Sequence, residues 1–319
     1  FSIGPQEFNL TSEILTQDSF LYEYTVFGDW NNYRTSIVDI NGKEIWNSGL
    51  FGFMMNHVSE FGQLFGCSQI SNGSGIEIDY NEHIVWNAMQ IVDQHEFKQI
   101  SNGNYMGFNG STELGPIPFG SWTANFQSMG FQADGVTYEY PFVGHRLMEF
   151  DSETGEQIWS WNPHNYFSKL ETDLHGGTWW QSLTWGTHDW THSNAFYFDQ
   201  EESVVYISHR HISRITKIAY PSGAVIWNIG MPAQYNTGSD NICTDLGNSF
   251  QHNIQLLDDG TLLFFDNGNL SPMLMGDSNP TSRIRRIRVI NNSSCETVWQ
   301  YDLPQNLYGL GMGSVQLLD

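Results

Sequence analysis

A repeated sequence pattern is the strongest constraint on how this 319-residue chain folds. Each copy consists of an apolar residue, an acidic or polar residue, a short turn rich in Gly or Asn, and an apolar residue followed by Trp. Five copies occur, and they end at Trp46, Trp86, Trp159, Trp227 and Trp299. Two short apolar segments around a tight turn are typical of a β-hairpin, and the Trp is expected to pack between neighbouring sheets.

A second repeat alternates with the first. Its copies span residues 95–105, 252–262 and 313–319, and the first two turn at Asn-Gly or Asp-Gly. An inner hairpin followed by an outer hairpin makes a four-stranded blade, so the sequence predicts an all-β propeller with long loops over one face, at 106–140 and 160–187. The whole chain, 1–319, is predicted to be one domain, with residues 1–30 as an N-terminal strand or blade-closing segment and 31–319 as the blade repeats. The third copy stops at Asp319, which leaves the last blade possibly incomplete.

Composition agrees with this architecture and excludes several functions. Aromatic residues make up 15% of the chain and there are 31 Gly, which favours short strands and tight turns. The formal net charge is 12 − 35 = −23, so binding to nucleic acid or to an anionic membrane surface is disfavoured. No apolar run is long enough to insert into a membrane. Nothing in the sequence sets the oligomeric state.

Cysteine usage and the N-terminus point to a location outside the cytoplasm. The three Cys residues match no zinc pattern and allow at most one disulfide. The chain begins Phe-Ser-Ile-Gly-Pro, without an initiator Met or a signal sequence, so we expect that a leader has been removed. A secreted or periplasmic protein is the prediction.

Four polar residues are predicted to form one site. His192 and Asn194 share one face of a predicted strand, and the following hairpin turn returns the chain so that Arg210 lies near His192. His95 and His252 each open an inner hairpin at equivalent repeat positions, which in a propeller surround the central axis. Trp190 lies in a Trp-rich stretch just before His192, where an aromatic ring could stack on a substrate.

These residues carry a family resemblance. The ordered motifs are His-x-Phe…Asn-Gly-Asn, Asp-Trp-x-His-x-Asn, Ser-x-Arg…Ile-x-Lys-Ile, Gln-His-Asn-x-Gln…Asp-Gly and Phe-Asp-Asn-Gly-Asn followed by Ser-Arg. Together they cover roughly residues 35 to 319, and in this order they resemble the arylsulfotransferase family. The resemblance implies a six-bladed propeller and a PAPS-independent transfer of a sulfuryl group from a phenolic sulfate ester to a phenol.

The resemblance also implies a role for each residue. His252 matches the nucleophilic histidine, and His95, His192 and Arg210 match its anion-binding and acid–base partners. Asn194 and Trp190 are expected to contact substrate. A neutral imidazole can attack sulfur to give a sulfohistidine, Arg can hold the sulfuryl oxygens, and a second His can protonate the leaving phenolate. The scheme requires no cofactor and no metal.

Two alternatives remain open at this point. The chain could be a non-catalytic binding or structural extracellular propeller that retains the family scaffold, because a fold does not fix a function. The three histidines could instead hold a metal ion. Arg210 argues against the metal, because a guanidinium in the same cluster would repel a cation.

Overall fold

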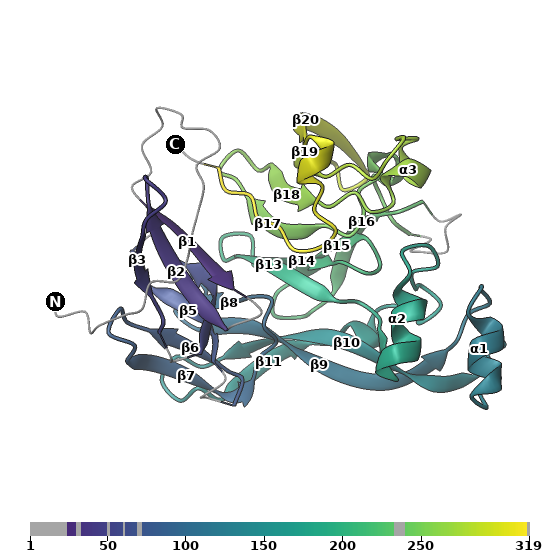
Figure 1. Ribbon diagram of the computed structural model, residues 1–319, viewed down its shortest axis with the longest axis horizontal. Coiled ribbons are helices and arrows are strands. Elements are labelled where there is room, and N and C mark those ends of the chain that lie inside the picture. The colour runs from purple at the N-terminus through teal and green to yellow at the C-terminus, as the bar shows by residue number, and fades with distance from the viewer. Residues whose placement is uncertain are drawn as a thin grey trace. The chain divides into compact units, whose positions relative to one another are not determined.

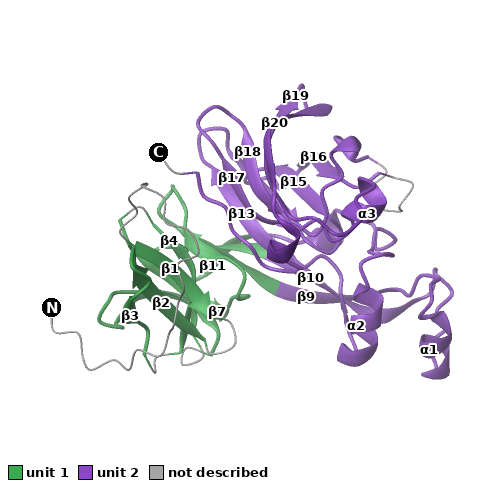
Figure 2. Ribbon diagram, turned by 45° about the horizontal axis from the view of Figure 1, so that its top comes forward, with its two compact units in different colours: residues 1–109, 147–160 green, residues 110–146, 161–319 purple. Residues whose placement is uncertain are grey.

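The computed structural model describes residues 24–29, 33–49, 52–59, 61–68, 72–232 and 240–317. These residues form mostly strands and a few short helices, and the fold is an all-β propeller (Figure 1). The chain divides into two compact units, residues 1–109 with 147–160 and residues 110–146 with 161–319 (Figure 2). We call them unit 1 and unit 2 and describe each by itself.

The described strands form five sheets, in which strands that follow one another along the chain pair side by side. The first two sheets contain β1 (Tyr24–Asp29), β2 (Arg34–Asp39) and β3 (Glu44–Asn47), and β4 (Phe53–Val58), β5 (Leu64–Ser68), β6 (Ser74–Ile78) and β7 (Ile84–Ile91). The third contains β8 (Phe97–Gln99), β9 (Tyr105–Pro116), β10 (Tyr138–Phe150) and β11 (Gln157–Trp161), with β12 (His188–Asp189) parallel to β10. The fourth and fifth contain β13 (Ser193–Asp199), β14 (Val204–His209), β15 (Arg214–Ala219) and β16 (Val225–Gly230), and β17 (His252–Leu256), β18 (Leu262–Asp266), β19 (Arg283–Ile290) and β20 (Ser294–Asp302).

The helices are short and lie in the connections. They are α1 (Thr123–Ser128), α2 (Thr178–Trp185) and α3 (Ser271–Leu274), with single 3₁₀ turns at Pro163–Asn165, Thr244–Leu246 and Gln305–Leu307. The first predicted loop, 106–140, contains the rest of β9, α1 and the start of β10, and the second, 160–187, contains a 3₁₀ turn and α2. Among the described residues, no helix is long and apolar enough to cross a membrane.

The predicted outer hairpins are confirmed. Each repeat Trp lies in the outermost strand of its sheet: β3, β7, β11, β16 and β20. In three copies an Asp closes the turn: Asp39 Oδ1 accepts the main-chain N–H groups of Asn41 and Lys43 at 2.8 and 2.9 Å, and Asp79 and Asp151 accept N–H groups of their own turns. A side-chain oxygen that replaces a main-chain partner in this way stabilises a tight turn.

The predicted number of blades is wrong. The described residues form five sheets, not six, and each sheet corresponds to one copy of the Trp-ended repeat. The fifth sheet has four strands and the first described sheet has three, and residues 313–317 form no strand. Residues 1–23 and 30–32, which include most of the predicted N-terminal segment, lie outside the described residues, so that prediction and the single domain stay predictions.

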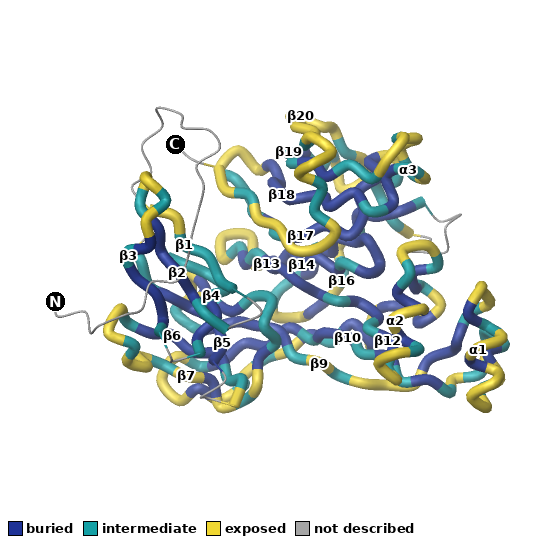
Figure 3. Tube along the Cα trace, in the orientation of Figure 1, coloured by how far each residue is buried: buried dark blue, intermediate teal, exposed yellow. Residues whose placement is uncertain are grey.

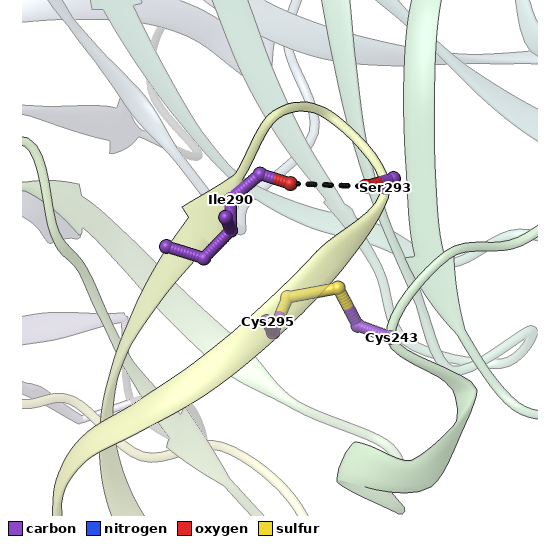
Figure 4. Close-up of a disulfide and its surroundings, with 4 residues drawn as sticks. All are labelled: Cys243, Ile290, Ser293 and Cys295. Atoms are coloured by element: carbon purple, nitrogen blue, oxygen red, sulfur yellow. Dashed lines mark hydrogen bonds between the residues drawn. A yellow bond between two sulfur atoms is a disulfide. The ribbon is translucent and has the colours of Figure 1, made fainter.

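Unit 2 has one large core between its fourth and fifth sheets. Side chains from β13 to β18 and from β19 pack together there, among them Ile215, Trp227, Phe264 and Ile287. The strands are mostly buried and the turns exposed (Figure 3). A disulfide between Cys243 and Cys295 ties the segment after β16 to β20 beside this core (Figure 4), and Cys67 is a buried free thiol.

Candidate active site

Three of the four predicted catalytic residues lie in unit 2. His192 sits between β12 and β13, Arg210 directly follows β14, and His252 opens β17. The β13–β14 hairpin pairs Ser193 with His209. Beyond that pair, the main-chain N–H of Arg210 donates to the main-chain oxygen of His192 at 3.1 Å. The predicted adjacency of His192 and Arg210 is therefore confirmed, and it follows from the hairpin register.

His252 is buried and held at both ring nitrogens. Its Nδ1 lies 2.7 Å from Oδ1 of Asn267, and its Nε2 accepts the main-chain N–H of Met312 at 3.3 Å. Asn267 Nδ2 donates to the main-chain oxygens of Gly309 and Met312 at 2.9 and 2.7 Å. Because a carbonyl oxygen can only accept, the end of the Asn267 amide that faces these two carbonyls must be its NH₂ group. The amide oxygen therefore faces His252. Nδ1 therefore carries the proton, and Nε2 carries the lone pair.

The segment Gly309–Met312, which we call the strap, connects His252 with Arg210. The main-chain oxygen of Leu310 accepts from Arg210 Nη2 and from Asn269 Nδ2, each at 3.0 Å. Leu310 and Met312 are only two residues apart, so the guanidinium and the imidazole contact one short stretch of main chain. The strap thus brings the predicted nucleophile and the predicted anion-binding residue to the same place.

Arg210 is held in a fixed orientation. Its guanidinium lies 4.8 Å above the Phe250 ring, and Nη1 lies 2.6 Å from Nε2 of His211. Burial lowers the pKa of Arg210, an effect opposed by the carboxylates of Asp189 and Asp173. A guanidinium nevertheless remains protonated in proteins, so Arg210 offers a planar, positively charged fork at this position.

Asp189 organises the histidines around it. Its Oδ2 hydrogen-bonds Nδ1 of His192, its main-chain oxygen lies 2.6 Å from Nδ1 of His211, and its Oδ1 lies 3.9 Å from Nδ1 of His145. Because Arg210 can only donate, His211 must accept at Nε2 and donate from Nδ1. Burial lowers the pKa of His211 well below its usual range, which agrees with a neutral ring.

Asp189, His192 and His211 also have the residue types of a metal site. Ligand atoms of Asp189, His192 and His211 lie within 4.8 Å of one another, and two histidines with a carboxylate suit a transition metal. However, a metal on His211 Nδ1 would displace its proton to Nε2, where Arg210 already donates. The hydrogen bonds therefore fit a proton-holding cluster better than a metal centre.

Three further predicted residues have different surroundings. Asn194 is buried, and its Nδ2 donates to the main-chain oxygen of Gln251 at 2.9 Å. Trp190 has no exposed surface. Its Nε1 donates to the main-chain oxygen of Glu171, and its ring stacks on the ring of His164. The ring of Trp190 packs inside unit 2, so it offers no face on which a substrate could stack in this arrangement. His95 lies in unit 1, where its Nδ1 and main-chain N–H both contact Asp93, and its convergence with the other three residues stays a prediction.

The comparison with protein families decides the identity. The model of the family described as Arylsulfotransferase (ASST) matches residues 24–319. The chain belongs to the arylsulfotransferase family. Membership supports aryl sulfotransferase activity in general, with small-molecule aryl substrates. No curated protein matches the chain.

Solved structures similar to this arylsulfotransferase are distant. They include a protein of unknown function from Bacteroides caccae (TM-score 0.44, 11% identity, 88% of this chain and 72% of that chain). Others are the Kuenenia stuttgartiensis hydrazine synthase (TM-score 0.46, 10% identity, 86% and 62%) and the Dos1 propeller (TM-score 0.42, 11% identity, 90% and 57%). The chain covers less than two thirds of the latter two proteins. TM-scores this low do not support a comparison of function.

The sequence reasoning missed several residues that build this arylsulfotransferase site. Asp189 lies within the Asp-Trp-x-His motif and Asn267 within the Asp-Asn-Gly-Asn stretch, so both had a signal that was available. His211 directly follows Arg210 in the sequence, and its residue type is its only signal. Phe250 and the strap carry no sequence signal of their own, because their place depends on long-range contacts.

Proposed function

We propose that this arylsulfotransferase moves a sulfuryl group from a phenolic sulfate ester, not from PAPS, to a phenolic acceptor through a sulfohistidine on His252. The observation that carries the proposal is the pair of contacts at the His252 ring, from which its tautomer follows. With the proton on Nδ1 facing Asn267, the Nε2 lone pair points to the strap that also binds Arg210. A lone pair beside a fixed cation is what attack on an anionic sulfate ester requires.

In the first half-reaction, the Met312 N–H gives up its hydrogen bond to Nε2 of His252, Nε2 forms a bond to sulfur, and the bond from sulfur to the aryl oxygen breaks. The electron pair of that bond goes to the phenolate oxygen, which takes a proton from His192. Arg210 holds the sulfuryl oxygens with its two outer N–H groups, because bidentate donation from a guanidinium matches their geometry. The positive charge on the sulfurylated imidazole is shared with its Nδ1–H, which still donates to Asn267.

In the second half-reaction, a phenol takes the place of the released product. His192, now neutral, removes the phenolic proton while the phenol oxygen attacks sulfur and Nε2 of His252 leaves. Asp189 suits this role for His192, because a carboxylate at Nδ1 stabilises the imidazolium that forms after each proton uptake. His95 is assigned to anion binding from the family motif.

The direct test is mass spectrometry after brief mixing with a chromogenic aryl sulfate. We expect one sulfuryl group on the peptide that contains His252, and its loss on addition of excess phenol. The variant His252→Asn should release no chromophore, whereas His83→Asn, at an exposed turn, should react as the unchanged protein does. Equal release by both variants would contradict the proposal.

A second candidate function is a non-catalytic propeller that retains the family scaffold. The strap favours it, because main-chain groups already contact both Arg210 and His252. The two candidates differ in one measurement: a protein that forms no adduct with a panel of aryl sulfates, although it is correctly folded, would be the binding propeller.

We further propose that the protein acts outside the cytoplasm. The Cys243–Cys295 disulfide supports this, because such bonds persist in oxidising compartments. Fractionation of the producing cells, with immunodetection of the chain, would test it. Recovery from the cytoplasmic fraction alone would contradict the proposal.

A further inference from the structure

Two histidines of this site differ in the group that accepts from Nδ1. His192 faces the carboxylate of Asp189, whereas His252 faces the neutral amide of Asn267. We propose that Asn267 is a positioning residue that keeps His252 in its nucleophilic tautomer without charging it, and that this difference in acceptors separates the nucleophile from the acid–base residue. The proposal rests on the proposed function and deepens it.

Asn267 is rigidly placed. It follows β18, it has no exposed surface, and its main-chain oxygen accepts from Ser282 Oγ at 2.9 Å. The same hydroxyl accepts the N–H of Gly309 at 3.0 Å, so the strap and Asn267 share one anchor. The next residue, Gly268, has φ +68°, and a Cβ there would lie 1.8 Å from the Thr281 oxygen. The turn therefore admits only glycine at 268 and fixes the direction of the Asn267 side chain.

The orientation of the Asn267 amide excludes the other tautomer of His252. Rotation of the amide by half a turn would aim its NH₂ at Nδ1, but its oxygen would then face the carbonyls of Gly309 and Met312. Three oxygens would meet without a proton between them. A proton on Nε2 in place of Nδ1 would also oppose the Met312 N–H that now donates there. Both contacts thus select the Nδ1–H form.

An amide suits this position better than a carboxylate would. A carboxylate at Nδ1 favours the imidazolium, in which Nε2 is protonated and cannot attack sulfur. An amide orients the ring by the same hydrogen bond and adds no charge. For His192 the opposite holds, because a residue that must pick up a proton benefits from the charge of Asp189.

The experiment compares Asn267→Leu and Asn267→Asp with the control Asn269→Ala in the full chain. Asn269 Nδ2 donates to the strap at the Leu310 oxygen, so its loss reports on the strap. The first readout is the tautomer of His252 from ¹⁵N chemical shifts of ¹⁵N-histidine-labelled protein, assigned with His252→Asn. The second is kcat/KM for an aryl sulfate as a function of pH.

We expect the unchanged protein and Asn269→Ala to show Nδ1–H at His252. Asn267→Leu should show a mixture of tautomers and at least a tenfold lower kcat/KM. Asn267→Asp loses the hydrogen bonds to Gly309 and Met312, but one carboxylate oxygen can still accept from Nδ1 of His252. It should therefore keep the Nδ1–H form and move the acidic limb of the pH profile upward by about one unit, as expected for a carboxylate neighbour. A structural role alone would not move that limb.

Three results would overturn the proposal: Nε2–H at His252 in the unchanged protein, an unaltered tautomer in Asn267→Leu, or an unshifted limb in Asn267→Asp. The tautomer measurement needs no turnover. If the protein forms no sulfuryl adduct, the proposed function fails, and the ¹⁵N shifts still decide whether Asn267 sets the tautomer. If Asn267→Leu does not fold, Asn267→Asp carries the test.

Discussion

Nη1 of Arg210 lies 2.6 Å from Nε2 of His211, so a permanently charged side chain is held by a histidine that must be neutral. The same guanidinium stacks on Phe250 and donates through Nη2 to Leu310. These three contacts involve both terminal nitrogens and the face of the guanidinium. Arg210 is therefore set in one plane before any substrate arrives, which is the condition for electrostatic stabilisation without reorganisation.

Replacement of Arg210 by Lys should lower kcat/KM for aryl sulfates between about tenfold and a hundredfold. Lys keeps the charge but not the planar fork, and one hydrogen bond to a charged group contributes about 1.5–3 kcal/mol. Steady-state kinetics with a chromogenic sulfate measures the change. The control is Arg288→Lys on the exposed side of β19, which should leave the kinetics unaltered. Equal kinetics for the two variants would remove Arg210 from the site.

The buried histidines of unit 2 should make the protein less stable as the pH falls below 6.5. Burial lowers the pKa of His188 to about 3, and those of His209 and His211 well below their usual range. Between pH 6.5 and 5, these three histidines therefore bind protons in the unfolded chain but stay neutral in the folded chain. Each such group reduces the free energy of unfolding by about 1.4 kcal/mol per pH unit in this window.

Urea unfolding at pH 7.5, 6.5, 5.8 and 5 measures this slope. His188→Gln should show a shallower slope by the contribution of one group, although Thr172 and Ser182 lose their partner and overall stability falls. His83→Gln, at an exposed turn, should reproduce the slope of the unchanged protein. A slope that does not differ between the two variants would mean that His188 is protonated in the fold.

Removal of the Cys243–Cys295 disulfide should destabilise unit 2. The bond closes a loop with a sequence separation of 52, for which the chain-entropy model gives about 4 kcal/mol. Urea unfolding of Cys243→Ala/Cys295→Ala should show this loss, and a reducing agent should lower the midpoint of the unchanged protein but not that of the variant. Cys67→Ala should keep the response to reduction, because Cys67 is a free thiol. A midpoint insensitive to reduction in Cys67→Ala would exclude a stabilising disulfide.

Equivalent Trp residues of the repeat should contribute unequally to stability. Trp227 is buried in the core of unit 2, whereas Trp299 is 49% exposed. Truncation of a buried large side chain costs about 3–5 kcal/mol, so Trp227→Ala should fall in that range. Trp299→Ala, at the same repeat position, should cost much less. Thermal and urea unfolding of both variants measures the difference, and equal losses would show that Trp299 is covered in solution.

The sequence predicted what depends on short-range signals. Three of the five hairpins turn at an Asp that accepts main-chain N–H groups of its own turn, as Asp39 does, and His192 meets Arg210 because one hairpin carries both. It did not predict the number of sheets, since the count of six came from the resemblance and not from the five repeats. Nor did it predict the burial of Trp190, because an aromatic residue alone does not say whether its ring faces the core.

The contacts of His252 show where such reasoning ends. Asn267 is 15 residues from His252, across the β17–β18 hairpin. The sequence showed the motif that contains Asn267, but it did not show that Asn267 contacts His252. Met312 is 60 residues away, and nothing local to either residue indicates that they meet. The site is assembled by packing between elements, which a periodic pattern does not encode.

The strap touches Arg210 and His252 through main-chain atoms alone, while the Leu310 and Met312 side chains are 67% and 55% exposed. Substitutions of Leu310 should therefore leave the two contacts in place, whereas Met312 has φ +60°, where a β-branched residue would strain the strap. Only a backbone change, such as proline at 312, which removes the donated N–H, would release His252. In protein engineering, position 310 is accordingly the one at which acceptor preference could be selected in a library while the main-chain contacts to Arg210 and His252 are kept.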